Sequence, residues 1–501
     1  MTEAAAAPPR PEDLGRVHLL GLAGVGVSAV ARLLQADDVP ISGTDGKELP
    51  VLDEFRAAGV PVRVGYRAEN LDSVEEEAGA PISTVIASSV AAEGNPEHDE
   101  ARRRGLPILH RSQGLAAVMA GRRGIAVAGT HGKTTTSSMA TVLLERAGRS
   151  PSFAVGATVA GLGVNAAAGD GDWFVAEADE SDGSLLNYRP EVAVITNVEA
   201  DHLDHHGTAE AVHRIFVEFT RRIVDGGLLV LCLDDPGAVA LLDDVAEELA
   251  ARDVEVLTYG FSADARLRLR EHRDAPAGTL GQQMLLGGPP AEDPERTGEE
   301  PGPDEEALLR LTVPGRHNAL NAAAAAAVGL RAGVPLAEAV EALGQFQGAS
   351  RRFDFRGEVD GVSVYDDYAH HPTEVAAVLA AARAAAGQEH AVHVVFQPHL
   401  YSRTQLFAAE FAEALAAADT VALLDVYPAR EEPIAGVTSE LIAEPLFARP
   451  TPPSGGVRSR EGAVAATVAA AASGDLVLTL GAGDVTALGA DLVEALERRG
   501  R

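Results

Sequence analysis

Cysteine and long apolar runs are nearly absent from this 501-residue chain. The one cysteine, Cys232, excludes an intrachain disulfide, and its apolar neighbours from Leu228 to Leu233 favour a buried strand thiol over a nucleophile. No apolar stretch approaches the ~20 residues of a membrane span, and the N-terminus lacks the basic-then-apolar layout of a signal peptide. We therefore expect a cytoplasmic protein with no membrane insertion.

Positive charge is also scarce. The chain has 41 lysines and arginines against 74 aspartates and glutamates, which gives a formal charge of −33. This balance disfavours nucleic acid as a partner, because binding a phosphate backbone needs clustered cations. A small anionic substrate remains compatible, since one focused pocket reverses the local potential. Only Lys47 and Lys133 are lysines, which suggests a role for a compact ammonium at the positions that keep one.

The length and the strand pattern predict three α/β domains, since a domain has roughly 100–200 residues. We place them at 1–120, with a mobile tail over 1–12, at 121–350, with a solvated acidic loop over 288–306, and at 351–501. We expect each domain to build its own sheet. Helices are expected at 28–35, 137–146 and 322–330, and strands at 17–20, before 45, and at 84–87, 125–128, 173–176, 192–196, 362–365, 392–396, 421–424 and 476–480.

A glycine-rich loop, GTHGKTTT at 129–136, follows an expected strand and opens an expected helix. In that context backbone N–H groups and the helix N-terminus face an anion, Lys133 reaches the terminal phosphates, and Thr134 offers its hydroxyl to Mg²⁺. The usual pattern has glycine five residues before Gly132, where Val127 stands here, so this is a shortened variant. The loop predicts a nucleotide site.

Acidic residues follow the next two expected strands, at 177–182 and at 199–201, the second group being followed by His202. Ligands of open parallel sheets bind beyond the carboxyl ends of the strands, so these groups would lie beside the phosphate loop. A carboxylate and an imidazole near a triphosphate predict a divalent metal site, and solvated acidic turns are the alternative.

The first domain has a glycine turn at 21–26 that resembles a dinucleotide fingerprint, with Asp45 at the end of the second strand where a ribose diol would bind. The pattern indicates a phosphate-facing turn but does not identify the nucleotide. In the third domain, strand ends carry polar runs at 366–374, 397–404 and 425–428. Capping and turn chemistry would explain these runs as well, and Pro372 starts a helix.

Taken together, these blocks resemble the Mur ligases over nearly the whole chain. The resemblance rests on 129–136, 177–182, 196–204, His317-Asn318 with Asn321, 351–353, 366–374, 397–404 and 481–484, in this order. It implies a Rossmann-like N-terminal domain that binds a UDP-sugar, a central P-loop ATPase with a mostly parallel sheet, and a Rossmann-like C-terminal domain that takes part in amino-acid and ATP binding.

Within the family the blocks are most similar to the member that joins L-alanine to the lactyl carboxylate of UDP-N-acetylmuramate. That activity proceeds through an acyl phosphate, gives ADP and phosphate, and belongs to peptidoglycan precursor synthesis, hence to cell-wall formation and cell division. The implied cofactors are ATP and Mg²⁺ at two sites, and the implied partners are the two substrates, with the protein a monomer or a weak dimer.

Roles carried over by position form four sets. The implied catalytic residues are Lys133, Glu177, His202, His370 and Arg403, with Thr134, Glu177 and His202 as metal ligands. The ATP site comprises Gly129, Thr130, His131, Gly132, Lys133, Thr134, Thr135, His317, Asn318, Asn321, Arg352 and Asp366. The UDP-sugar site comprises Gly21, Gly24, Gly26, Asp45, Ser88 and Asn197. Tyr368, His370, His399 and Arg403 would surround the amino acid, with Arg403 on its carboxylate and Leu400 where many relatives have arginine.

Three alternatives remain. A related ligase that attaches a recycled tripeptide to the same sugar nucleotide is the nearest, although 180–184 and Asp367-Tyr368 look more like the alanine ligase. A nicotinamide-dependent oxidoreductase built on the turn at 21–26 leaves the phosphate loop unexplained. A nucleotide-switched binding protein leaves the histidines and arginine of the third domain unexplained.

Overall fold

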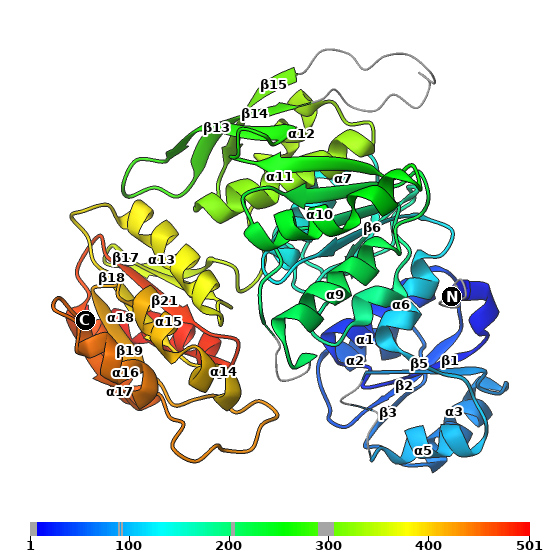
Figure 1. The fold of residues 1–501 in the computed structure, drawn as a ribbon. Helices are drawn as coiled ribbons and strands as arrows, with labels where there is room; N and C mark the ends of the chain where they lie inside the picture. The colour runs from blue at the N-terminus through cyan, green and yellow to red at the C-terminus, as the bar shows by residue number, and fades with distance from the viewer. Residues whose placement is uncertain (1–7, 89–90, 92–93, 202–205, 289–304, 501) are drawn as a thin grey trace. The chain divides into compact units, whose positions relative to one another are not determined.

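The computed structural model describes residues 8–88, 91, 94–201, 206–288 and 305–500 (Figure 1). The chain divides into two units, each with its own dense internal packing. The first comprises Met1–Thr158, Leu162–Arg266 and Ala327–Val334, and the second comprises Val159–Gly161, Leu267–Ala326 and Pro335–Arg501. No helix among the described residues is long and apolar enough to cross a membrane.

The N-terminal sheet has the order β3-β2-β1-β4-β5, and every pairing is parallel. Strands β1 and β4 are buried along their whole length, as expected of a parallel sheet covered on both faces. The elements are η1 (Pro11–Leu14), β1 (Val17–Leu20), α1 (Val25–Ala36), β2 (Ile41–Asp45), α2 (Val51–Ala57), β3 (Val62–Val64), α3 (Glu69–Ala78), β4 (Thr84–Ala87), α5 (Pro96–Arg103), β5 (Ile108–His110) and α6 (Arg111–Met119).

The central sheet of the first unit has the order β12-β11-β10-β6-β9-β7-β8, parallel except for β7 with β8. Strand β6, which leads into the phosphate loop, lies between β10 and β9. The elements are β6 (Arg123–Ala128), α7 (Lys133–Arg146), β7 (Ser152–Ala154), β8 (Ala166–Ala167), β9 (Trp173–Glu177), η2 (Ser184–Asn187), β10 (Val192–Ile195), α9 (Ala209–Thr220), β11 (Leu228–Cys232), α10 (Pro236–Ala250) and β12 (Glu255–Gly260).

The second unit contains an antiparallel ladder, β13-β14-β15, and a further sheet of order β16-β17-β21-β18-β19-β20. In that sheet only β16 runs antiparallel. The elements are β13 (Leu267–Asp274), β14 (Gln282–Gly288), β15 (Glu305–Leu311), α11 (Arg316–Arg331, whose end belongs to the first unit), α12 (Leu336–Leu343), β16 (Asp354–Val359), β17 (Val362–Asp367), α13 (Pro372–Ala386), β18 (Val392–Phe396), α14 (Tyr401–Leu406), α15 (Ala408–Leu415), β19 (Thr420–Leu423), α16 (Glu440–Phe447), β20 (Ser454–Val457), α17 (Arg460–Ala470), β21 (Leu476–Leu480), η3 (Asp484–Ala487) and α18 (Leu488–Arg499).

The expected α/β class, with mostly parallel sheets in three domains, is confirmed. Several local expectations are wrong. Helix α7 begins at Lys133 rather than at 137, because Thr134, Thr135 and Thr136 are buried and packing overrides their weak helix propensity. Of the acidic loop expected over 288–306, Gly288 ends β14 and residues 305–306 lie in β15, while residues 289–304 lie outside the described ranges. Of the expected tail, Pro11 is buried in η1, and residues 1–7 are not described.

Candidate active site

The phosphate loop is fastened to the segment that follows the neighbouring strand, β10. The amide of His131 donates to Oδ1 of Asn197 at 2.8 Å, and Nδ2 of Asn197 donates to the carbonyl of His131 at 3.0 Å. A Cβ at Gly129, where φ is +132°, would lie 2.0 Å from Oγ1 of Thr196. The loop therefore has room only for glycine at its first position.

Lys133, the first residue of α7, points its ammonium back over the loop. Nζ donates to the carbonyls of Gly129 at 2.7 Å and Thr130 at 3.0 Å, and it lies 2.8 Å from a carboxylate oxygen of Glu180. Burial lowers the pKa of Lys133, but the nearby carboxylates Glu180 and Asp179 outweigh that effect and raise it overall. Burial also raises the pKa of Glu180, to about 7, despite the ammonium beside it. Lys133 is thus held as a cation at neutral pH.

Thr134 and Glu177 meet at the end of β9. The hydroxyl of Thr134 donates to Oε1 of Glu177 at 3.0 Å, and the amide of Gly156 donates to Oε2 at 2.7 Å. A hydroxyl and a carboxylate are the hard oxygen donors that Mg²⁺ prefers, so the donor set fits that ion. Residue His202, expected as a further ligand, lies outside the described residues.

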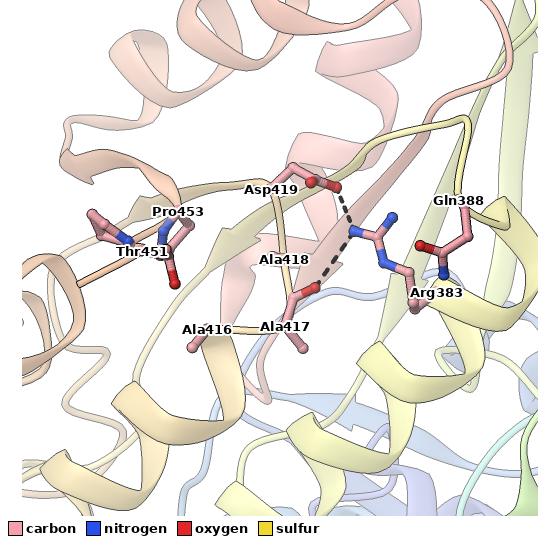
Figure 2. A pocket seen from close by; sticks show the side chains of 9 residues that line it. Arg383, Gln388, Ala416, Ala417, Ala418, Asp419, Thr451 and Pro453 are labelled. Atoms are coloured by element: carbon pink, nitrogen blue, oxygen red, sulfur yellow. Dashed lines mark hydrogen bonds and ion pairs between the residues drawn. The ribbon is translucent and has the colours of Figure 1, made fainter. Parts of the chain in front are cut away.

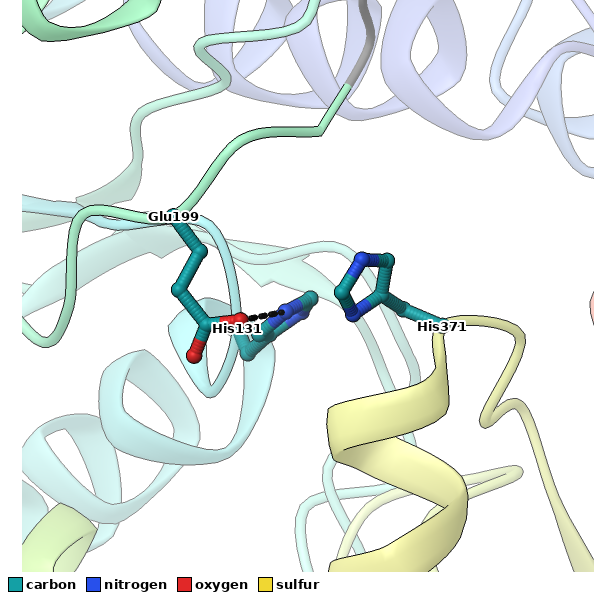
Figure 3. Close-up of side chains that lie close together, drawn as sticks. All are labelled: His131, Glu199 and His371. Atoms are coloured by element: carbon teal, nitrogen blue, oxygen red, sulfur yellow. Dashed lines mark ion pairs between the residues drawn. The ribbon is translucent and has the colours of Figure 1, made fainter. Parts of the chain in front are cut away.

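Glu199, one of the acidic residues expected beside the phosphate loop, lies against two residues of that loop. Its amide donates a hydrogen bond to Oγ1 of Thr130 at 2.9 Å. Its carboxylate lies 3.5 Å from Nε2 of His131 (Figure 3). Thr135, also expected at the nucleotide, is buried in the first turn of α7. The expected ATP-site residues of the loop thus lie between the end of β6 and the first turn of α7.

The glycine turn, where the sugar nucleotide was expected, lies between β1 and α1. Gly21 has φ +76° and Gly24 is the N-cap of α1. Asp45 accepts hydrogen bonds from the amides of Ala23 at 2.9 Å and Lys47 at 3.1 Å, so its carboxylate also shapes the turn. Ser88 follows β4, the other neighbour of β1, at the same carboxyl edge of the sheet. A ligand held at this edge would lie where the strand order reverses.

In the second unit, three expected adenine contacts gather at the start of α11. Nδ2 of Asn318 donates to the carbonyl of Pro314 at 2.7 Å, and Nδ2 of Asn321 donates to Oδ1 of Asn318 at 3.3 Å. Burial lowers the pKa of His317 to about 4, and the guanidinium of Arg352 contributes in the same direction. The His317 imidazole is therefore neutral at pH 7.

Asp366, the expected ribose contact, lies at the end of β17 with its carboxylate fully buried. It accepts hydrogen bonds from the hydroxyls of Thr479 at 2.6 Å and Thr486 at 2.8 Å. Nε of Arg351 lies 3.4 Å away and donates to it as well, while Nη2 of Arg351 donates to the carbonyl of Gly481 at 2.6 Å. These partners, which sequence reasoning did not assign, lock Asp366 into the edge between β17 and β21.

Three of the expected amino-acid contacts form a row of rings. The centroids of Tyr368 and His370 are 5.2 Å apart, and those of His370 and His399 are 6.0 Å apart. Burial, together with the Arg403 guanidinium, lowers the pKa of His399 to about 4. Arg403 itself is only 5% exposed, on α14. The structure therefore brings these four residues together at the carboxyl edge of the C-terminal sheet.

A pocket of about 420 Å³ lies at the opposite edge of that sheet, before β18, β19 and β20 begin (Figure 2). Its one cation, Arg383, is paired with Asp419 and also donates to the carbonyl of His390 at 3.0 Å. The pocket is separate from the residues described above.

Comparison with known proteins decides the family. Three family models match in succession: "Mur ligase family, catalytic domain" over 16–123, "Mur ligase middle domain" over 127–329, and "Mur ligase, glutamate ligase domain" over 351–483. The chain belongs to the Mur ligase family. Each model covers one of the three sheet-containing regions in which the candidate residues lie.

This Mur ligase is similar along its length to curated relatives. It is 55% identical over 486 residues to UDP-N-acetylmuramate–L-alanine ligase of Arthrobacter sp. (strain FB24), covering 97% of this chain and 96% of that protein. It is 45% identical over 495 residues to the protein of the same name in Mycobacterium marinum (strain ATCC BAA-535 / M), covering 98% and 96%.

Among solved structures, this Mur ligase matches UDP-N-acetylmuramate-alanine ligase MurC of Thermotoga maritima with a TM-score of 0.72 and 25% identity, over 97% of this chain and 99% of that one. A murein peptide ligase from Psychrobacter arcticus 273-4 matches with a TM-score of 0.64 and 24% identity, over 96% and 98%. The second likeness extends to the fold alone.

Proposed function

We propose that this Mur ligase joins L-alanine to the lactyl carboxylate of UDP-N-acetylmuramate through an acyl phosphate, giving ADP and phosphate from ATP, in peptidoglycan precursor synthesis. Full-length relatives that are 45–55% identical and are named for this reaction carry the proposal. The phosphate loop with its buried Lys133 supports the ATP-dependent step.

In the first step a lactyl carboxylate oxygen attacks the γ-phosphorus of ATP, the bond to the β-bridging oxygen breaks, and ADP leaves. Lys133 would neutralise charge on the transferred phosphoryl group, and the N-terminus of α7 would face its oxygens. In the second step the alanine amine attacks the acyl carbon, the amine loses a proton, and phosphate leaves from the tetrahedral intermediate. The protein forms no covalent intermediate in this scheme. Its side chains position the substrates and neutralise charge on the phosphoryl group.

The protein would hold Mg²⁺ at two sites. Thr134 would bind the ion of the first site, and Glu177 with His202 would bind the ion of the second. The ion supplies neutralisation of the phosphate oxygens when bound. Glu177 is aimed by two donors, the hydroxyl of Thr134 and the amide of Gly156, so its carboxylate is oriented before any ion arrives. Such orientation supports the assignment of Glu177 as a ligand.

The remaining assignments follow the expected positions. His317, Asn318 and Asn321 would contact adenine, with Arg352 beside them, and Asp366 would contact the ribose. Tyr368, His370, His399 and Arg403 would surround the alanine. The lowered pKa of His399 keeps this ring neutral, and Arg403 would supply positive charge for the alanine carboxylate. Gly21, Gly24, Gly26, Asp45 and Ser88 would hold the uridine nucleotide, with Asn197 near the muramyl group as well as fastening the phosphate loop.

The experiment is phosphate release with ATP and Mg²⁺, adding UDP-N-acetylmuramate and then single amino acids, with the product identified by mass spectrometry. We expect release to need both the sugar nucleotide and L-alanine, with one alanyl residue added. Lys133→Ala should abolish turnover in a folded protein, and Arg403→Ala should chiefly raise the KM for alanine. Ligation of a tripeptide in place of alanine, or release that ignores both substrates, would contradict the proposal.

A further inference from the structure

His370 and Glu374 lie close together between strand β17 and the first turn of helix α13. His370 is in the connection that follows β17, and Glu374 is the third residue of α13. Their side chains are 15% and 13% exposed, so both are largely removed from water. His370 is expected at the amino acid, whereas Glu374 is not among the residues assigned above to a substrate, to ATP or to a metal.

One carboxylate oxygen of Glu374 faces three nitrogen atoms. Oε2 accepts hydrogen bonds from the amides of His370 at 3.0 Å and His371 at 3.3 Å. The same oxygen lies 3.2 Å from Nδ1 of the His370 ring. The bond from the His371 amide belongs to a capping box, which by itself accounts for an acid at the third position of a helix. The contact with the ring is not part of such a box and indicates a second role.

The surroundings of Nδ1 determine the tautomer of His370. Besides Glu374, the carbonyl oxygen of Tyr368 lies 3.0 Å from Nδ1. A carbonyl oxygen and an ionised carboxylate only accept hydrogen bonds, so Nδ1 carries the proton. In the neutral ring the lone pair is then on Nε2, the nitrogen farther from the backbone. The negative charge of Glu374 also stabilises the imidazolium that forms when Nε2 takes up a proton.

The proposed reaction releases a proton beside this ring. When the alanine amine attacks the acyl carbon, its nitrogen gains positive charge and must lose a proton. The His370 ring lies in the row of rings proposed to surround alanine, with centroids 5.2 Å from Tyr368 and 6.0 Å from His399. Burial lowers the pKa of His399 to about 4, so that ring is a weak base at neutral pH. His370 is the ring of the row that has a carboxylate behind it.

We propose that Glu374 positions His370 so that Nε2 of this ring accepts the proton from the attacking alanine amine. The bond between nitrogen and the acyl carbon forms, and the proton passes from nitrogen to Nε2. The bond between that carbon and the phosphate oxygen then breaks, and phosphate leaves with its electron pair. This inference rests on the proposed function and adds the acceptor of the proton in its second step. Glu374 acts through His370 and is a positioning residue.

The titration of His370 can be separated from that of its neighbours. His317 and His399 have pKa values of about 4, well below neutral. Burial raises the pKa of Asp367 to about 6, and Glu374 contributes in the same direction, so Asp367 titrates near the ordinary range of a histidine. A variant that lacks His370 distinguishes these two groups. Among the described residues, the other charged or titratable neighbours are Tyr368, Arg351, Arg352 and Arg403.

The test is the pH dependence of the single-turnover rate of alanine ligation, with the full-length protein in excess over UDP-N-acetylmuramate and with saturating ATP and alanine. Glu374→Gln keeps a carbonyl oxygen for the two amides but removes the charge. Its rate should be about 10- to 100-fold lower, which is part of the 10²–10⁴-fold that general base catalysis contributes. The fall in rate towards low pH should also move to lower pH by about one unit, because the charge that stabilised the imidazolium is gone.

A second comparison makes the same change in protein that lacks His370. His370→Gln leaves the helix cap intact and should be at least about 100-fold slower than the native protein. Because Glu374 acts through His370, adding Glu374→Gln to this variant should change the rate by less than about 2-fold. Ser459→Ala is the matched control for a lost cap, since Ser459 accepts a hydrogen bond from the amide of Gly462 at 3.1 Å at the start of α17. It should keep the native rate and pH profile.

Three results would overturn the inference while alanine ligation by the native protein upheld the proposed function. They are a native rate in Glu374→Gln or in His370→Gln, a lower rate in Glu374→Gln with an unshifted pH profile, and an equal loss from Glu374→Gln with and without His370. Native protein that ligates no alanine would overturn both. Circular dichroism on each variant separates these outcomes from misfolding.

Discussion

Replacing Gly129 with alanine is expected to destabilise the central domain by about 2–5 kcal/mol and to abolish ATP binding. The backbone has φ +132°, which costs an L-residue roughly 1–2 kcal/mol. The new Cβ would also lie 2.0 Å from Oγ1 of Thr196 and 3.0 Å from its amide nitrogen. Crowding of this kind adds about 1–3 kcal/mol, because backbone must shift to relieve it.

Gly148→Ala is the matched control. Gly148 follows α7 in the same domain, with φ +66°, but a Cβ there would meet no atom within 4 Å. It should lose only the conformational part, about 1 kcal/mol, and keep ATP binding. The difference between the two variants therefore measures the crowding at the phosphate loop.

The chain has one tryptophan, Trp173, and it is buried in β9 of the central sheet. Its fluorescence in urea reports the unfolding of this domain without contributions from the others. ATP binding is measured on the same samples by titration calorimetry. Equal destabilisation by the two alanines, or native ATP affinity in Gly129→Ala, would refute the argument that steric fit requires glycine at position 129.

Three further outcomes are expected. Lys133→Met removes the cation beside Glu180. The pKa of Glu180 in the folded protein is already raised to about 7, so folding takes up a proton near neutral pH. The free energy of unfolding, measured in urea, should therefore fall more steeply in this variant than in the native protein as pH rises from 6 to 8. Gly156→Ala would place a Cβ 2.7 Å from Oε2 of Glu177, so half-maximal phosphate release should need about 10-fold more Mg²⁺, and an unchanged Mg²⁺ requirement would remove Glu177 from the metal site. The pKa of His317 in the folded protein is about 4, below its ordinary value, so as pH falls from 6.5 towards 4 the unfolded chain binds a proton that the folded protein does not. His317→Asn should therefore lose less thermal stability over that pH range than the native protein, as measured by scanning calorimetry.

The sequence was sufficient to predict the strands that carry the site. Residues 17–20, 84–87, 392–396 and 476–480 are strands with the predicted bounds, because short apolar runs between turn residues have few other structures open to them. The phosphate loop was predictable for the same reason, since its glycines and lysine follow such a run. Polar residues at strand ends could then be assigned to one edge of each sheet.

The partners of the site residues could not be predicted in this way. Gly156 contacts Glu177 from another part of the chain, and no local pattern marks that contact. The acidic run at 177–182 was expected beside the phosphate loop, but nothing in it indicated that Glu180 would be the residue paired with Lys133. The start of α7 was misplaced because propensity was judged without packing. The ladder β13-β14-β15 was missed, although the alternation of leucine with charged residues from Leu267 was a usable signal.

The central claim is that the lactyl carboxylate is phosphorylated before alanine attacks. The most direct measurement uses UDP-N-acetylmuramate with ¹⁸O in that carboxylate, and follows the label by mass spectrometry of the released phosphate. The account predicts one ¹⁸O in each phosphate, formed only when L-alanine is also present and matched by one alanyl product. Unlabelled phosphate would show that water, not the carboxylate, attacks ATP, and would contradict the account.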